Sequence, residues 1–176
     1  TTMLPDDEIF CIDKETWSLY FDGASSNQGY GVGILLISPG NEHIPISIKL
    51  EFKATNNVAE YEACLHGLKA AINLKIRKLR VYGDSSLIIN QITGAWKVYN
   101  ENLTLYQECI SKLIEEEFDQ IEFTHLPRED NQFADALSKL ASLVNIPDYV
   151  EAMPVLIERS YEPGYIGTIE EDENLQ

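Results

Sequence analysis

The sequence predicts an α/β domain in which helices pack on the faces of a mixed sheet, and three observations lead to this class. Three strand-like segments follow one another between residues 17 and 52, which favours an antiparallel meander. Helical and strand-like patterns then alternate from residue 57 to residue 143. The chain has 176 residues, 44% of them hydrophobic, which suffices for one domain of ordinary size with its own core.

Each of the three opening strands has its own signal. Residues 17–21 are rich in aromatic side chains and run into Asp22 and Gly23, a turn-forming pair. Residues 29–38 are mostly apolar and end in the turn sequence Ser-Pro-Gly-Asn. Residues 43–52 carry isoleucine at every second position from 44 to 48, which is the period of a half-buried strand.

The second half of the domain alternates helices and strands. A helix is predicted over residues 57–74 and a strand over 79–82, and two helices follow, over 85–93 and 103–116. A strand over 121–125 and a helix over 131–143 complete the domain. The predicted sheet therefore has five strands, and helices pack on its faces.

The first helix carries two carboxylates with different predicted surroundings. At 100° per residue, the helix has an apolar stripe (Val58, Tyr61, Leu65, Leu68, Ile72) and a solvent stripe (Glu62, His66, Lys69, Asn73). Glu60 lies about 150° from the solvent stripe, among small residues, so we expect it to point into a packed or clefted region. The alternative is a capping box in which Glu60 reaches back to Asn57.

Three aspartates also lie at the ends of elements. Asp22 ends the first strand, Asp84 follows the strand at 79–82, and Asp135 lies in the first turns of the last helix. Singly, they fit a turn former, a helix N-cap and a solvent-exposed residue, respectively. The third explanation places Asp135 opposite an apolar stripe made of Phe133, Leu137, Leu140 and Val144. None of these explanations accounts for the joint placement of four acids at neighbouring strand ends and helix starts.

Four carboxylates in one place require cations. At an effective dielectric constant near 20, each like-charged pair at 4 Å costs about 4 kcal/mol. Oxygen ligands without an accompanying histidine or thiolate pair favour Mg²⁺ or Mn²⁺ over zinc. A pair of such ions roughly 4 Å apart suits in-line attack at a phosphodiester. The sequence therefore predicts a site for two Mg²⁺ ions, with Mn²⁺ as the alternative, at Asp22, Glu60, Asp84 and Asp135.

The net charge of −16 is concentrated at the two ends of the chain. Residues 1–16 carry −4 and residues 148–176 carry −7, which leaves −5 for residues 17–147. We expect the domain to span 17–143, between an acidic linker at 1–16 and an acidic, proline-containing linker or tail at 144–176 that is disordered in isolation. Such ends are typical of a piece of a longer polypeptide.

Composition also restricts the compartment. No apolar run approaches the roughly 20 residues of a membrane span, and no secretory signal is visible. Cys11, Cys64 and Cys109 lie far apart, without the CxxC spacing of a thiolate zinc site, and suit a reducing compartment. We therefore expect an intracellular protein that is not secreted and has no membrane partner.

Four segments, in this order, resemble type I ribonuclease H: FDGAS at 21–25, TNNVAEYEA at 55–63, YGDSS at 82–86 and HLPREDNQFADALSKLAS at 125–142. The closest likeness is to the ribonuclease H domain of plant gypsy-type LTR retrotransposon polyproteins. The resemblance implies a five-stranded mixed sheet with its first three strands antiparallel, and cleavage of the RNA strand of RNA–DNA hybrids in reverse transcription. It also implies reverse transcriptase and integrase parts of the same polyprotein as partners, in the cytoplasm, virus-like particles or the nucleus.

The resemblance also assigns roles to the four acids. Asp22 is expected to bridge both metals, and Asp135 to complete the site that activates the attacking water. Glu60 and Asp84 are expected to complete the second site, at the leaving oxygen.

Further roles implied by the resemblance concern product release and substrate binding. His125 precedes Asp135 by ten residues and is expected to assist product release, with Arg128 as the alternative. The residues expected to bind the substrate are Thr55, Asn56, Asn57, Ser85 and Arg128. Helix capping is an alternative role for the Thr-Asn-Asn segment, compatible with the first.

Two other functions stay open at this point. One is a catalytically weak ribonuclease H-like domain that binds or tethers nucleic acid, and the other is a DNA-directed relative such as a transposase or exonuclease. Residues 94–117 contain only two bases, Lys97 and Lys112, where many cellular enzymes of the family carry a basic helix. We therefore expect a weak grip on substrate, and a domain trimmed of both acidic ends that works at least as well as the whole chain.

Overall fold

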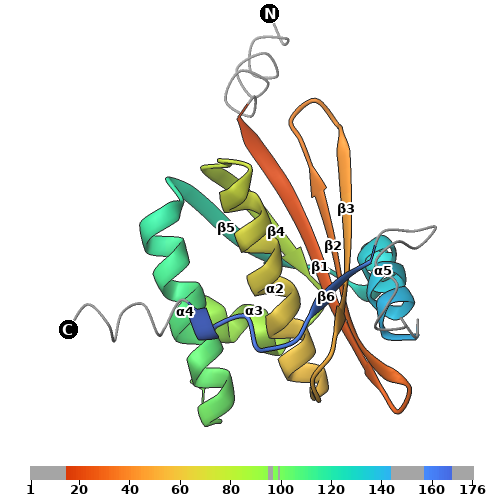
Figure 1. Ribbon diagram of the computed structural model, residues 1–176. Helices are drawn as coiled ribbons and strands as arrows, with labels where there is room; N and C mark the ends of the chain where they lie inside the picture. The colour runs from red at the N-terminus through yellow and green to blue at the C-terminus, as the bar shows by residue number, and fades with distance from the viewer. Residues whose placement is uncertain (1–14, 95–96, 99, 144–156, 168–176) are drawn as a thin grey trace, which may run out of the picture.

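The computed structural model describes residues 15–94, 97–98, 100–143 and 157–167, which contain a six-stranded mixed sheet in the order β5-β4-β1-β2-β3-β6 (Figure 1). The strands β1 (Thr16–Ser26), β2 (Gly29–Ile37) and β3 (His43–Leu50) form the predicted antiparallel meander. On the other side of β1, β4 (Lys78–Gly83) pairs parallel with β1, and β5 (Gln120–His125) pairs parallel with β4. The predicted fold class is confirmed.

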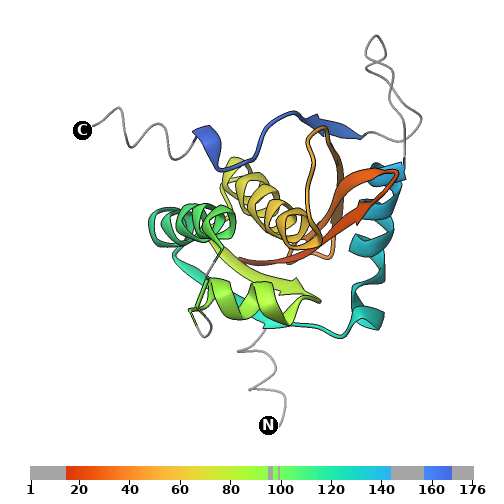
Figure 2. The same ribbon diagram turned by 90° about the horizontal axis from the view of Figure 1, so that it is seen from below.

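Helices lie on both faces of this sheet (Figures 1 and 2). One face carries α2 (Asn56–Asn73), with α3 (Ser86–Ile92) and α4 (Glu101–Glu117) beside it. The opposite face carries α5 (Gln132–Leu143), which follows a short 3₁₀ turn, η1 (Arg128–Asn131). Among the described residues, no helix is long and apolar enough to span a membrane.

The core lies between α2 and the sheet. Leu19 and Phe21 of β1 are fully buried, and so are Val32 and Ile34 of β2. The α2 side chains that pack on them, Tyr61, Leu65 and Leu68, belong to the predicted apolar stripe and are also fully buried. Residues next to Leu19 and Phe21 in β1 point to the opposite face, so Asp22 is directed toward α5 rather than into this core.

The prediction of five strands omitted β6 (Glu158–Ser160), which pairs parallel with β3 at the edge of the sheet. Next to the last residue pair of these two strands, the Glu51 N–H donates a hydrogen bond to the Ser160 carbonyl over 2.8 Å. Residues 157–167 therefore pack on the domain, although we expected the whole acidic segment to lack structure. Three residues are too short to show a strand period, so the sequence gives no signal for β6. Residues 1–14, 144–156 and 168–176 lie outside the described part.

Two predicted helix faces are wrong in the structure. Glu62 was placed on the solvent stripe of α2, yet its side chain is 0% exposed because Tyr106 of α4 and residues 157–167 cover it. On α5, Phe133 and Leu140 of the predicted apolar stripe are 54% and 38% exposed. The side that faces the sheet consists of small residues: Ala134, Ser138, Ala141 and Ser142.

Candidate active site

Asp22 lies in the middle of β1, in a position made by two glycines. Its antiparallel partner on β2 is Gly33, where an added Cβ would lie 2.1 Å from the Ala134 carbonyl oxygen of α5. Next to it, an added Cβ at Gly23 would lie 2.3 Å from the Ala59 carbonyl carbon of α2. The missing side chains let helices approach β1 from both faces of the sheet. Asp22 is consequently 4% exposed.

Glu60 comes from the first turns of α2 and points toward Asp22. The residue that caps this helix is Thr55, whose hydroxyl accepts from the Val58 N–H over 3.2 Å. The alternative of a capping box between Asn57 and Glu60 is therefore wrong. The Glu60 side chain is left free to enter the crevice between α2 and β1, where the residue is 9% exposed.

Asp84 follows β4 directly, and its side chain is 3% exposed. The N-cap of α3 is Ser85, whose hydroxyl accepts from the Ile88 N–H, so Asp84 does not cap this helix. The Nε of Arg128 lies 3.9 Å from its Oδ2, which is too far for a hydrogen bond. The ordinary explanation of Asp84 as a helix cap is therefore wrong.

These three acids converge. Among the described residues, Asp22, Glu60 and Asp84 each contribute one carboxylate oxygen to a group of three oxygens that lie within 4.8 Å of one another. Within the same part of the chain, Glu60 Oε2 and Asp84 Oδ2 are buried and have no hydrogen-bond partner. Burial and the neighbouring charge of Asp84 raise the pKa of Asp22 to about 7, although a hydrogen bond with Glu60 opposes this rise. Burial, followed by the charge of Asp22, raises the pKa of Glu60 well above its ordinary value.

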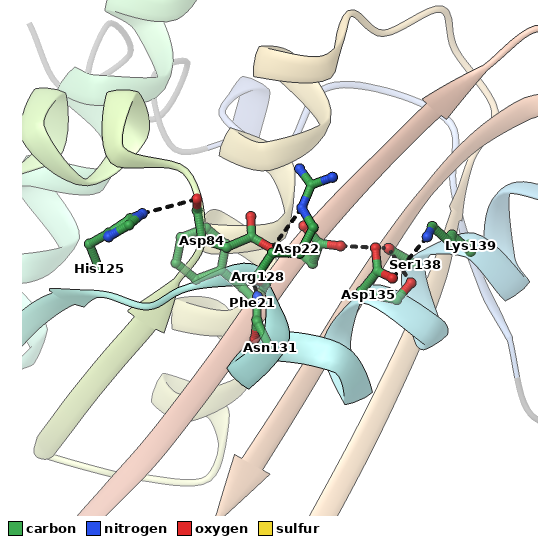
Figure 3. A network of polar contacts seen from close by, with 9 residues as sticks. All are labelled: Phe21, Asp22, Asp84, His125, Arg128, Asn131, Asp135, Ser138 and Lys139. Carbon is green, nitrogen blue, oxygen red and sulfur yellow. Dashed lines mark hydrogen bonds and ion pairs between the residues drawn. The ribbon is translucent and has the colours of Figure 1, made fainter.

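Asp135 completes the predicted set from the other side of Asp22 (Figure 3). It lies outside the group of three, and its side chain is 25% exposed. Its carboxylate pairs with Lys139, one helical turn on, over 2.9 Å. Burial alone would raise the pKa of Asp135, but hydrogen bonds from Lys139 and Asp22 and the charge of Lys139 lower it. Asp135 is therefore held ionised beside a cation, whereas Asp22 and Glu60 are held among anions.

The structure adds three polar residues that the sequence did not single out. Ser138 lies with its hydroxyl 3.2 Å from Asp22 Oδ2 and 2.8 Å from the Asp135 carbonyl oxygen. Buried Asn131 donates from Nδ2 to the Phe21 carbonyl over 2.9 Å and so fixes the start of α5 on β1 (Figure 3). Asn131, Ser138 and Lys139 are spaced at −4, +3 and +4 from Asp135, which places them on its side of the helix.

The remaining predicted site residues divide between a groove and its surroundings. A groove of about 550 Å³ contains all four acids. Of the other predicted residues, it is lined by Asn56, Asn57, Ser85 and Arg128. Thr55 caps α2 and is not among the lining residues. His125 is also outside the lining, with Nε2 3.2 Å from the Asp84 carbonyl oxygen (Figure 3).

Comparison with known proteins places this arrangement in a family. A family model described as reverse transcriptase-like matches residues 20–141. The ribonuclease HI of Halobacterium salinarum is 37% identical over 124 residues, which cover 69% of this chain and 62% of that protein. The chain thus spans less than two thirds of the length of this relative.

Solved structures agree with the sequence comparison. The crystal structure of ribonuclease H1 from the same archaeon matches with a TM-score of 0.68 at 34% identity, over 72% of this chain and 96% of that one. A ribonuclease H1 crystallised in complex with an RNA/DNA hybrid matches with a TM-score of 0.62 at 29% identity, over 70% of this chain and 94% of that one. Both matches cover nearly the whole of the solved chains.

Proposed function

The chain belongs to the ribonuclease H-like family of enzymes, and from this premise we propose that it hydrolyses the RNA strand of RNA–DNA hybrids with divalent metal ions. The observation that carries the proposal is the convergence of the Asp22, Glu60 and Asp84 oxygens within 4.8 Å, with Asp135 beside them in an open groove. A nuclease with this chemistry needs a cluster of oxygen ligands that substrate can reach.

The donor set fits hard divalent cations. All four candidate ligands are carboxylates, and no histidine or cysteine belongs to the group of three found among the described residues. Two of the buried oxygens, Glu60 Oε2 and Asp84 Oδ2, lack a hydrogen-bond partner in that part of the chain, which is costly unless a cation binds there. Mg²⁺ is the proposed ion, two per site, and Mn²⁺ is the alternative with the same ligand preference.

The roles proposed for the acids follow from their positions. Asp22 lies between Asp84 and Asp135 in Figure 3, so it is proposed to contact both ions. Asp135, held ionised by Lys139, completes the site for the attacking water, and Glu60 and Asp84 complete the site at the leaving oxygen. Bound ions supply a nucleophilic water and stabilise charge on the leaving oxygen.

Polar side chains at the rim of the groove are proposed to bind the hybrid. Asn56 and Asn57 offer amides along the groove, and Ser85 offers a hydroxyl. These groups can form hydrogen bonds with the 2′-hydroxyl groups and base edges of a bound hybrid. Arg128 is 80% exposed and reaches toward the groove, so it is proposed to contact phosphate or assist product release. Thr55 and His125 lie farther out and are proposed to act at the edge of the bound substrate, with Thr55 also serving as the helix cap.

The biological setting is proposed on the motif likeness. The order and the amino-acid sequences of the four acid-bearing segments favour a retroelement polyprotein of the plant gypsy type. In that setting, the reverse transcriptase and integrase parts of the same polyprotein are the proposed partners, and the cytoplasm, virus-like particles or the nucleus the proposed location. Cys64 and Cys109 are buried and form no disulfide within the described residues, which suits a reducing compartment.

The test is a panel of end-labelled substrates. RNA–DNA hybrid, double-stranded RNA and double-stranded DNA are incubated with the whole chain in Mg²⁺, in Mn²⁺ or in EDTA. We expect cleavage of the RNA strand of the hybrid alone, in either metal, and none in EDTA. Binding of the hybrid without cleavage of any substrate would favour the tether, and cleavage of double-stranded DNA would favour the DNA-directed relative.

A further inference from the structure

Residues 157–167, which we call the strap, lie outside the stretch 20–141 that the family model matches. In Figures 1 and 2 the strap runs from the β3 edge of the sheet across α2 toward α4. It therefore touches elements on both sides of the candidate active site. The four acids come from β1, α2, the end of β4 and α5, so any segment that ties α2 to α5 affects how the acids are placed.

At its first end, the strap is attached to α5 and β3. Ile157 is 7% exposed and forms a small buried cluster with Ala141 of α5. From there β6 pairs with β3, whose own side chains hold α5 from beneath. Ser47 donates from its hydroxyl to the Leu137 carbonyl over 2.7 Å, and Lys49 donates from Nζ to the Ser142 carbonyl over 3.3 Å. The strap thus extends the layer on which the helix carrying Asp135 rests.

At its second end, the strap is anchored on the buried carboxylate of Glu62, which lies two residues after Glu60 in α2 and on the other side of that helix. The Gly164 N–H donates to Glu62 Oε1 over 2.8 Å. Tyr106 of α4 donates its hydroxyl to the same oxygen, and His66 Nε2 lies 3.0 Å from Oε2. Removing the strap would take away one of these donors and open the carboxylate to water on that side.

Packing at this end is tight around Gly164. An added Cβ there would lie 3.0 Å from Leu65 Cδ2 and 3.2 Å from Glu62 Oε2. The following residue, Tyr165, packs edge-on against Tyr106 with ring centroids 4.9 Å apart. Lys69 of α2 donates to the Gly164 carbonyl, so both backbone polar groups of this glycine are satisfied by α2. A buried acid, an aromatic contact and a closely packed glycine make this a specific docking site for the strap.

We propose that the strap is a positioning segment of the catalytic domain: anchored on Glu62, it ties α2 to β3 and α5 and holds Glu60 and Asp135 in their relative places. The catalytic half of this proposal rests on the proposed function, whereas docking and metal binding do not. The strap does not line the groove. It therefore acts through the elements that carry the acids and not by contact with substrate.

The experiment uses the whole chain with two pairs of variants. Gly164→Val places a branched side chain against Leu65 and Glu62, while Gly167→Val is its control, because no atom of the described residues lies within 4 Å of an added Cβ at Gly167. Tyr165→Ala removes the ring that packs on Tyr106. Tyr161→Ala is its control, because it makes the same change at a residue of the strap that is 66% exposed. The second pair keeps the test usable if Gly164→Val does not fold.

Three quantities are measured on each variant: hydrogen exchange of the Glu51 amide, which donates to Ser160; calorimetric affinity for Mn²⁺; and kcat and KM for a hybrid. In Gly164→Val and Tyr165→Ala we expect faster exchange of this amide, about tenfold weaker Mn²⁺ binding and a similar loss of kcat, with KM nearly unchanged. Both control variants are expected to behave as the wild type. Re-adding Mn²⁺ to saturation should restore most of the lost kcat, which a general loss of folded protein would not allow.

Two results would overturn the proposal. One is rapid exchange of the Glu51 amide in the wild type, which would mean that the strap does not dock. The other is faster exchange in Gly164→Val or Tyr165→Ala with Mn²⁺ affinity unchanged, which would mean that the strap docks without positioning the acids. If the wild type binds Mn²⁺ and cuts no hybrid, the proposed function fails, while the exchange and affinity measurements still decide the role of the strap.

Discussion

At the scale of single residues, the acids of the site differ in how their charge is supported. Asp22 and Glu60 are buried among other carboxylates, and burial is the first cause of the raised pKa of each. Asp135 is paired with Lys139 and has a lowered pKa. One fold thus holds two acids that favour a proton when no cation is bound and one acid that stays ionised.

The first prediction concerns the pH dependence of stability without metal. The pKa of Asp22 in the folded protein, about 7, lies above the ordinary value of 3.8, so the folded state binds this proton more tightly than the unfolded state. Its contribution is therefore fully present below about pH 4 and is lost as pH rises toward 7. In EDTA, Asp22→Asn should remove this loss, so that the variant becomes the more stable protein near neutral pH. Urea unfolding of both proteins from pH 4 to pH 8 checks it, and an unchanged pH dependence in Asp22→Asn would contradict it.

The second prediction separates Arg128 from His125. Arg128 lines the groove, whereas His125 contacts the Asp84 carbonyl from outside it. Arg128→Ala should lower kcat/KM about tenfold through a lost charged contact with phosphate, and His125→Ala should lower it less. Steady-state kinetics on one hybrid decides between them. A larger loss of kcat/KM in His125→Ala than in Arg128→Ala would contradict this prediction and would favour His125 as the residue that assists product release.

The residues of the site were predictable to different degrees. Glu60 and Asp84 were predictable because each lies at a helix start or a strand end beside small residues, whereas the placement of Asp22 at the end of its strand was wrong, since β1 continues to Ser26. Asn131 and Ser138 were not predictable, because their contacts depend on how closely α5 approaches β1 and β2. Helical spacing from Asp135 was the available signal, but spacing alone does not tell whether a polar residue faces a site or solvent.

At the scale of elements, the site depends on helices that approach the sheet over glycine. The third prediction is that Gly33→Ala lowers stability by about 1–3 kcal/mol and lowers the rate of cleavage, because its Cβ would lie 2.1 Å from backbone oxygen of α5. Gly40→Ala is the matched control, since its nearest neighbour would be the Ser38 hydroxyl at 3.8 Å. Thermal unfolding and hybrid cleavage measure both effects. Equal behaviour of the two variants would show that α5 does not rest on β2 as described.

Helix positions were predicted to within a few residues, but two helix faces were not. The turn of α2 that bears Glu62 reads as a solvent stripe because the segment that covers it comes from residue 157 onward, far along the chain. On α5, the sheet beneath the helix presents Gly29, Gly31 and Gly33, so small residues face it and Phe133 is left 54% exposed. A prediction from hydrophobic periodicity assumes that a helix packs on one apolar surface with one face. On α2 a second side is also covered, and on α5 the packed face consists of small residues.

At the scale of the whole molecule, negative charge limits the grip on nucleic acid. The net charge is −16, and the cations that line the groove are Arg128 and Lys139, of which Lys139 is already paired. The fourth prediction is that affinity for a hybrid falls with salt along a slope of about −2 or shallower, because the slope counts neutralised phosphates. Binding of Asp84→Asn, which leaves the hybrid uncut, across a salt series measures it. A slope steeper than about −5 would reveal phosphate contacts that the groove does not contain.

The meander, the parallel strands and the order of the elements were predictable because each has a local pattern of adequate length. The extent of the domain was not. We expected residues from 144 onward to be a dispensable acidic tail, whereas Ile157, Gly164 and Tyr165 pack on the domain. A three-residue edge strand and a single glycine carry no period, so only the three-dimensional contacts identify the strap.

The acid cluster is proposed to be the metal-dependent centre that cuts RNA, and removing one charge from it is the most direct test. Asp84→Asn keeps the volume of a buried side chain that does not cap a helix and whose Oδ2 has no hydrogen-bond partner within the described residues. Asp130→Asn makes the same change on the exposed η1 turn. Single-turnover cleavage of a hybrid in Mg²⁺ should fall at least about a hundredfold in Asp84→Asn and stay at the wild-type rate in Asp130→Asn. Near-normal cleavage of the RNA strand by Asp84→Asn would contradict the account.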